Sequence, residues 1–290
     1  MTQDMWSRPE EWDAELAHSS ALILEHRAAA EDQVRLRAAL IEMAEVAPGQ
    51  TVLEVGSGTG ALLVDLALVV GPGGRAIGIE PQPHLAAIAG AHLEAHGTAN
   101  WSEVRQGRAE ALTLPDAVVD LCVAQTVFLH LTDEIRARAL AEMIRVTRPG
   151  GQVLTVDQDM STFVINHPDR QLTARLLQAN LSNYEQPAMG RMARARFLDA
   201  GLCDVRVQVI VQAESDRSAF LVGACERMAR GAAARGGVTT DELDRWLEQL
   251  ARVVESDRFF ASLNYYACIG RRPGVAAEPF RHRDPALPTR

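Results

Sequence analysis

The chain has 290 residues, of which 47% are hydrophobic, and its formal net charge at pH 7 is −9. This length suits one large domain or a domain with an insertion, and the apolar fraction suits a sizeable core. The acidic balance argues against nonspecific nucleic-acid binding, and no apolar run approaches the roughly 18 residues that span a bilayer. Because the polar start Met1-Thr2-Gln3-Asp4 is unlike a signal peptide, we expect a cytoplasmic protein with no membrane partner.

Two residue types narrow the function classes further. The chain contains no lysine, so all 29 basic residues are arginines, which excludes a P-loop lysine and a Schiff-base lysine. The cysteines are far apart and form no C-x-x-C pair, so we expect reduced, mostly buried thiols and no metal site. They are Cys122, Cys203, Cys225 and Cys268.

Strand and helix signals alternate along the first half of the chain. Residues 10–48 have near-helical apolar spacing, and Ala47-Pro48-Gly49-Gln50 ends that pattern. The alternation that follows predicts an α/β fold, a mostly parallel sheet covered by helices on both faces. The expected strands are Thr51–Val55, Arg75–Glu80, Trp101–Arg105, Asp120–Gln125 and Gly151–Asp157, and the expected helices are Ala61–Val70, His84–His96 and Asp133–Val146.

The pattern changes after Asp157, where helical signals dominate. Aromatic and aliphatic residues near the end indicate a closing strand, and the Pro- and Arg-rich terminus is typical of a disordered tail. We expect mainly helix over 167–201, a strand at Val205–Val211, helices near 216–233 and 240–255, the closing strand at Phe259–Ile269, and the tail from Arg271 to Arg290.

The most informative motif is V-L-E-V-G-S-G-T-G, from Val52 to Gly60. Alternating glycines after a buried strand allow a sharp turn and a close approach of the backbone to a ligand. Glu80 lies at the tip of the next expected strand, where a carboxylate can accept hydrogen bonds from ribose hydroxyls. The motif therefore predicts a ligand that carries a nucleoside.

The glycine loop by itself is compatible with two cofactors, because residues 56–61 also satisfy the G-x-G-x-x-[GA] dinucleotide pattern. Glu54 distinguishes between a dinucleotide and S-adenosylmethionine and favours the latter. A negative charge just before the glycines suits the ammonium of an amino acid and would repel a pyrophosphate. Two later features, T-V-F-L-H-L at 126–131 and R-P-G-G at 148–151, agree with S-adenosylmethionine.

With these motifs the sequence resembles the class I, seven-stranded S-adenosylmethionine-dependent methyltransferases. It is most similar to the small-molecule branch that includes the ubiquinone and menaquinone C-methyltransferases. The supporting segments are G-I-E-P at 78–81, G-R-A-E-A-L-T-L-P at 107–115, L-H-L at 129–131 and R-P-G-G. The resemblance implies a doubly wound sheet of seven strands whose last strand is antiparallel, with N-terminal helices and a helical insertion before that strand.

The resemblance also implies a cofactor site. The glycine loop would hold the methionine portion, and Glu80 at the end of the second strand would hold the ribose. The ends of the later strands would lie beside the adenine and the methyl donor. The implied cofactor-binding residues are Glu54, Gly56, Ser57, Gly58, Thr59, Gly60, Glu80, Pro81, Gln82, Ala109, Glu110, Gln125 and Thr126. Arg108 departs from the family, which often has an acid there, since an arginine cannot accept a hydrogen bond from the adenine amino group.

Catalytic candidates are few, because an activated methyl donor needs mainly proximity, orientation and exclusion of water. His130 and Asp157 are the candidate catalytic residues, each with a structural alternative as a loop-holding or capping group. Asp159 and His167 are further candidates, but a role in a turn or a helix cap explains them as well. Trp6 and Trp12 are candidates for a lid, or for packing of a helix at the sheet edge.

These inferences divide the chain into four parts. They are a helical lid or edge at 1–48, the cofactor-binding core at 49–158, helical acceptor-pocket insertions with the closing strands at 159–270, and the tail at 271–290. The insertion before the last strand would shape the acceptor pocket or form a homodimer contact. We expect methyl transfer to a small organic acceptor, such as a specialised metabolite. The alternatives are a cofactor-binding cyclase or pericyclase that transfers no methyl group and a NAD(P)-dependent oxidoreductase.

Overall fold

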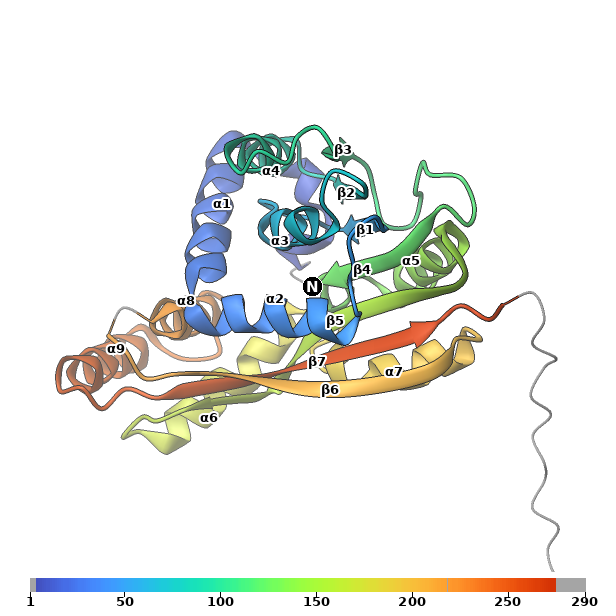
Figure 1. The fold of residues 1–290 in the computed structure, drawn as a ribbon. Coiled ribbons are helices and arrows are strands. Elements are labelled where there is room, and N and C mark those ends of the chain that lie inside the picture. The colour runs from blue at the N-terminus through green and yellow to red at the C-terminus, as the bar shows by residue number, and fades with distance from the viewer. Residues whose placement is uncertain (1–3, 218, 275–290) are drawn as a thin grey trace, which may run out of the picture.

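The computed structural model describes residues 4–217 and 219–274, which form a seven-stranded sheet with helices on both faces (Figure 1). The strand order is β3-β2-β1-β4-β5-β7-β6, and β7 is antiparallel to both of its neighbours. This topology confirms the expected fold class. The strands are β1 Thr51–Val55, β2 Arg75–Glu80, β3 Ser102–Gln106, β4 Val119–Gln125, β5 Thr147–Ile165, β6 Cys203–Glu214 and β7 Ala261–Arg271.

The helices divide between the two faces of the sheet. Helices α2, α3 and α4 pack with strands from β1 to β3 and with β6, whereas α5 and α7 pack on β4, β5 and β7. No helix among the described residues is long and apolar enough to cross a membrane. The helices are α1 Ala14–Ala29, α2 Glu31–Met43, α3 Ala61–Val70, α4 Pro83–Ala95, α5 Asp133–Val146, α6 Arg170–Asn180, α7 Met189–Asp199, α8 Phe220–Ala234 and α9 Thr240–Glu255, with short 3-10 turns at Met5–Ser7, Pro9–Glu11, Phe128–His130 and Leu181–Asn183.

The core lies between the central strands and these helices. Val52, Leu53 and Val55 of β1 are almost fully buried, since helices cover the sheet on both sides. Helix α3 buries Leu62, Leu63 and four further apolar side chains against β1 and β2. Parallel strands held in this way end together at one edge of the sheet, where the glycine turn after β1 lies.

Most element boundaries shift by a few residues from those expected, and three differences matter for the fold. The single helical region expected at 10–48 is two helices, because Ala30 has an extended backbone and ends α1 before α2 begins. Strand β5 does not stop at Asp157 but continues to Ile165, paired with β7 as far as Ile165–Ala261. That pairing joins segments about a hundred residues apart, so no local pattern indicates it.

The expected tail also begins later than Arg271. Arg271 is the last residue of β7, and the amide of Arg272 donates to the Gly151 carbonyl at 2.9 Å. The Arg272 guanidinium donates to carbonyls at the end of α5 and the start of β5, including that of Thr147 at 2.6 Å. The remainder of the predicted tail, 275–290, lies outside the described residues.

Candidate active site

The turn after β1 is built from three glycines in the left-handed region, Gly56 (φ 73°), Gly58 (φ 54°) and Gly60 (φ 87°). A Cβ on Gly56 would lie 2.5 Å from Cγ2 of Val127, and a Cβ on Gly60 would lie 2.8 Å from the Cβ of Ala89. Neither position has room for a side chain. Gly56 and Gly58 face a cavity at the carboxyl ends of the strands, so backbone rather than side chains forms this part of its wall.

Two buried carboxyl groups flank this turn. Glu80, at the end of β2, accepts hydrogen bonds from the amides of Gly58 (2.8 Å) and Gln82 (3.0 Å), and its burial raises its pKa to about 7. Burial, and then the nearby Glu80, raise the pKa of Glu54 well above its usual value. The Glu54 Oε2 atom has no hydrogen-bond partner among the described residues. A ligand that brings hydroxyl or ammonium donors would stabilise both carboxylates, which is what the ribose and amino group of S-adenosylmethionine offer.

Further along the cavity, the end of β4 and the loop after β3 complete the cofactor side. Thr126 has a positive φ of 58°, and its hydroxyl accepts a hydrogen bond from Arg27 of α1 at 2.6 Å. Arg108 donates to Glu110 at 2.6 Å and also pairs with Glu10. Arg108 therefore holds two acids in place and has no capacity to accept a hydrogen bond from an adenine.

These walls enclose a cavity of about 580 Å³, a volume typical of small-ligand sites. Eight predicted cofactor residues line it: Gly56, Gly58, Glu80, Pro81, Ala109, Glu110, Gln125 and Thr126. The other five, Glu54, Ser57, Thr59, Gly60 and Gln82, lie behind its wall. The Gln82 amide donates to the Pro9 carbonyl at 2.7 Å and accepts from the His84 amide at 2.9 Å, so it caps α4 and fastens the N-terminal segment.

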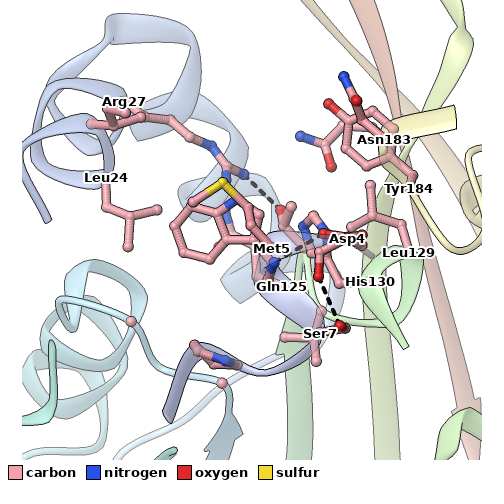
Figure 2. Close-up of a pocket in the computed structure, with 18 of the residues that line it drawn as sticks. Asp4, Met5, Ser7, Leu24, Arg27, Gln125, Leu129, His130, Asn183 and Tyr184 are labelled. Carbon is pink, nitrogen blue, oxygen red and sulfur yellow. Dashed lines mark hydrogen bonds and ion pairs between the residues drawn. The ribbon is translucent and has the colours of Figure 1, made fainter. Parts of the chain in front are cut away.

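The N-terminal segment covers one side of the cavity and reaches His130. Figure 2 shows Asp4 and His130 together, with Tyr184 beside them and Arg27 extending from α1. The Asp4 Oδ2 atom lies 2.7 Å from His130 Nδ1, and both residues line the cavity. Trp6 also lines the cavity and packs edge-on against Trp12, with ring centroids 4.7 Å apart. The segment is therefore in the position that a lid would take.

The other acid and histidine candidates lie away from the cavity. Asp157, whose pKa burial raises to about 6, accepts a hydrogen bond from the Leu129 amide at 3.1 Å and so supports the loop after β4. Asp159 is fully buried against Arg191. The His167 ring stacks on Trp246 with centroids 4.5 Å apart. These contacts agree with the loop-holding and capping alternatives for the three residues, and Asp157 is not among the residues that line the cavity.

Sequence reasoning missed several residues of the site. Arg27 lines the cavity from α1, Arg227 from α8, Arg235 from the position just after α8, and Gln158 from β5. The sequence pattern G-x-x-x-R repeats at 223–227 and 231–235, which places these four residues on one side of a helix. No local pattern indicated Gln158, because β5 was expected to end before it.

Comparison with known proteins agrees with this geometry. Residues 52–151 match the methyltransferase domain family. The strand order and the glycine turn agree with this match, and over these residues the chain is similar to the seven-stranded, class I methyltransferases.

Particular relatives show how far the similarity extends. The chain is 28% identical over 238 residues to an uncharacterized 37.1 kDa protein in transposon Tn4556 of Streptomyces fradiae, an alignment covering 81% of this chain and 66% of the relative. It is 35% identical over 118 residues to the ubiquinone/menaquinone biosynthesis C-methyltransferase UbiE of Hahella chejuensis, covering 40% and 46%. The YcgJ protein of Bacillus subtilis shares the fold, with a TM-score of 0.55 at 19% identity, covering 82% of this chain and 97% of that structure. The alignments thus span less than two thirds of the length of these two curated relatives.

Proposed function

We propose that this protein transfers a methyl group from S-adenosylmethionine to a small organic acceptor. The observation that carries the proposal is the glycine turn and Glu80, which open into a cavity continuing from the cofactor side to α8. One end of this cavity has the backbone and carboxylate groups that an amino acid and a ribose require. The other end is lined by side chains from α1, α8 and β7 and leaves room for a second molecule.

The residues of the cofactor end bind and orient the donor. Gly56 and Gly58 allow close approach of its methionine portion, Glu80 accepts hydrogen bonds from ribose hydroxyls, and Glu54 attracts the ammonium from behind the turn. S-adenosylmethionine supplies an activated methyl group on a sulfonium. The protein contributes proximity, in-line orientation and, through Trp6 and the N-terminal segment, exclusion of water.

His130 is the proposed general base for an acceptor that must lose a proton. A carboxylate only accepts hydrogen bonds, so Asp4 holds the proton on His130 Nδ1 and leaves Nε2 as the basic nitrogen. His130 Nε2 would take the proton from the acceptor atom, and bound S-adenosylmethionine would supply the methyl group to that atom. Asp4 orients the imidazole through this hydrogen bond.

The direct test has two stages with the full chain. Calorimetry should show saturable binding of S-adenosylmethionine and S-adenosylhomocysteine, weakened at least tenfold by Glu80→Gln. The variant Glu103→Gln is the matched control, because Glu103 lies on β3 outside the cavity. Mass spectrometry with an acceptor panel should then show S-adenosylhomocysteine and an acceptor 14 mass units heavier. Absence of cofactor binding would overturn the proposal.

A second result would also count against methyl transfer. If the cofactor binds with normal affinity but stays intact with every acceptor, while an acceptor rearranges without a change in mass, the protein is a cofactor-dependent cyclase or pericyclase. The cavity would then serve to fold a substrate rather than to present it to the methyl group.

A further inference from the structure

We propose that the acceptor carries an oxyanion, a carboxylate or phosphate, which Arg27, Arg227 and Arg235 bind at the α8 end of the cavity. This inference rests on the proposed function and specifies its substrate class. All three arginines line the cavity. Arginine suits such a ligand because its planar guanidinium can give two parallel hydrogen bonds to a carboxylate or phosphate.

Helix α8 is shaped to keep two of these guanidinium groups beside its own surface. Arg227 Nη1 lies 3.0 Å from where a Cβ on Gly223 would be, and Arg235 Nη1 lies 3.5 Å from the equivalent point on Gly231. Each arginine thus folds back over a glycine four residues earlier, and its guanidinium lies against the helix surface there. Gly231, Arg227 and Arg235 line the cavity together, so this face of α8 is its cationic wall.

Helix α1 brings the third arginine, Arg27, between this wall and Thr126 on the cofactor side. The ring of His26, next to Arg27 in the chain, lies 5.7 Å from the ring of Phe220 at the start of α8, and the Arg227 guanidinium lies 5.2 Å from that same ring. Figure 1 shows α8 beside the end of α1. Burial raises the pKa of Tyr184 to about 12, and the positive charge of Arg27 opposes this shift. Tyr184 likewise interacts electrostatically with Arg227, so it lies near both guanidinium groups.

The acids of the cavity do not neutralise this wall. Asp4 pairs with His130, Glu10 and Glu110 pair with Arg108, and Glu80 accepts two backbone amides. Within residues 4–217 and 219–274, Arg227 and Arg235 have no ion pair with any carboxylate, and the hydrogen bond of Arg27 goes to the neutral hydroxyl of Thr126. The acids that line the cavity are therefore held by other partners, and the guanidinium groups of Arg227 and Arg235 form no ion pair among the described residues.

Arg227 and Arg235 remain exposed to solvent, so an oxyanion there would replace water with charge-assisted hydrogen bonds to their guanidinium groups. Neighbouring amides add neutral donors, since the Asn183 side chain also lines the cavity. A neutral acceptor would leave these charges unmatched. The wall thus selects for acceptors with a carboxylate or phosphate remote from the methylated atom.

The test uses the full chain saturated with S-adenosylhomocysteine, with inorganic diphosphate, inorganic phosphate and benzoate as probes at constant ionic strength. We expect at least one probe to raise the Tm saturably by about 2 °C or more over sodium chloride. Diphosphate or phosphate alone would identify a phosphate site, and benzoate alone a carboxylate site. The double variant Arg227→Gln/Arg235→Gln should abolish the shift, whereas Arg230→Gln, on the same helix but outside the cavity, should keep it.

The two proposals fail separately in this experiment. If S-adenosylhomocysteine binds and no probe acts beyond the chloride control, or the shift persists in the double variant, the oxyanion site is overturned and the methyltransferase proposal stands. If S-adenosylhomocysteine does not bind to the wild-type protein, both are overturned. The single variants Arg227→Gln and Arg235→Gln, each expected to weaken probe binding at least threefold, keep the test valid if the double variant does not fold.

Discussion

The Oδ2 atom of Asp4 lies 2.7 Å from Nδ1 of His130, joining the start of the chain to the loop that follows β4. Asp4 is almost fully buried there, and its other oxygen accepts a hydrogen bond from the Trp6 amide at 3.0 Å. The contact fixes the imidazole and closes the N-terminal segment over the cavity with the same hydrogen bond. A single hydrogen bond thus both holds the N-terminal segment over the cavity and orients the proposed base.

His130→Gln and Asp4→Asn should therefore lower kcat about a hundredfold or more for an acceptor that must be deprotonated. In Asp4→Asn, the new side-chain amide would favour the opposite tautomer of the His130 ring, with the proton on Nε2. Affinity for S-adenosylhomocysteine should change less than about twofold in either variant, because neither side chain belongs to the proposed cofactor cradle. His96→Gln, an exposed histidine on the far end of α4, is the control. Unchanged kcat in His130→Gln would show that this residue is not the base.

Cofactor binding should strengthen as the pH rises through 7. Burial raises the pKa of Glu80 in the free protein to about 7, and ribose hydroxyls bind its ionised form, so binding releases a proton below that pH. Affinity for S-adenosylhomocysteine should be about tenfold lower at pH 6 than at pH 8. Calorimetry in two buffers of different ionisation enthalpy would measure the proton release. A flat profile in the wild type would contradict the assignment of Glu80, and Glu80→Gln should remove the dependence.

The same raised pKa affects the stability of the free protein. Because the folded state holds the Glu80 proton more tightly than the unfolded chain, this group contributes most to stability below pH 4.5, and that contribution is lost as the pH rises to about 7. Asp157, with a pKa near 6, acts in the same direction. Urea titrations should therefore show these two contributions declining between about pH 4 and 7, and saturating S-adenosylhomocysteine should offset the loss due to Glu80.

Gly60→Ala tests the packing of the glycine turn. A methyl group there would meet Ala89 at 2.8 Å and also hold a left-handed φ of 87°, so we expect a loss of stability of about 2–4 kcal/mol and weaker cofactor binding. Gly97→Ala is the matched control, since Gly97, just after α4, has a φ of 70° but no atom within 4 Å of the added methyl. This control variant should lose only about 1–2 kcal/mol of stability, which is the cost of holding an alanine in a left-handed backbone conformation. Equal losses in urea denaturation would show that the contact with Ala89 is unimportant.

Arg136→Lys should loosen the loop that holds His130. The buried Arg136 guanidinium donates to the Phe128 carbonyl at 2.9 Å and also to the carbonyl of Leu131, and a lysine cannot reach both with the same fork. We expect a loss of about 2–4 kcal/mol and a fall in kcat, with cofactor affinity preserved. Arg138→Lys, on the exposed side of α5 opposite Glu134, should change stability by less than about 0.5 kcal/mol.

Much of the cofactor end could be predicted from the sequence because its information is local. The glycines must follow a strand directly, and Glu80 must end the next one, so chain spacing and strand alternation place them together. Local patterns do not specify which of these side chains face the cavity: Gln82 caps α4 and hydrogen-bonds the Pro9 carbonyl, and neither it nor Asp157 lines the cavity. The hydrogen bond from the Leu129 amide to Asp157 likewise depends on how the loop after β4 packs.

The sequence by itself determined the fold class, the order of strands and helices in the core, and the class of cofactor, because each follows from patterns within a few residues or one βαβ unit. Only the tertiary structure decided what surrounds the acceptor. Asp4 and His130 are 126 residues apart, and Arg27 and Arg227 are farther still. Contacts at such separations arise from how β5, β7 and α8 pack on the core, which no local spacing specifies.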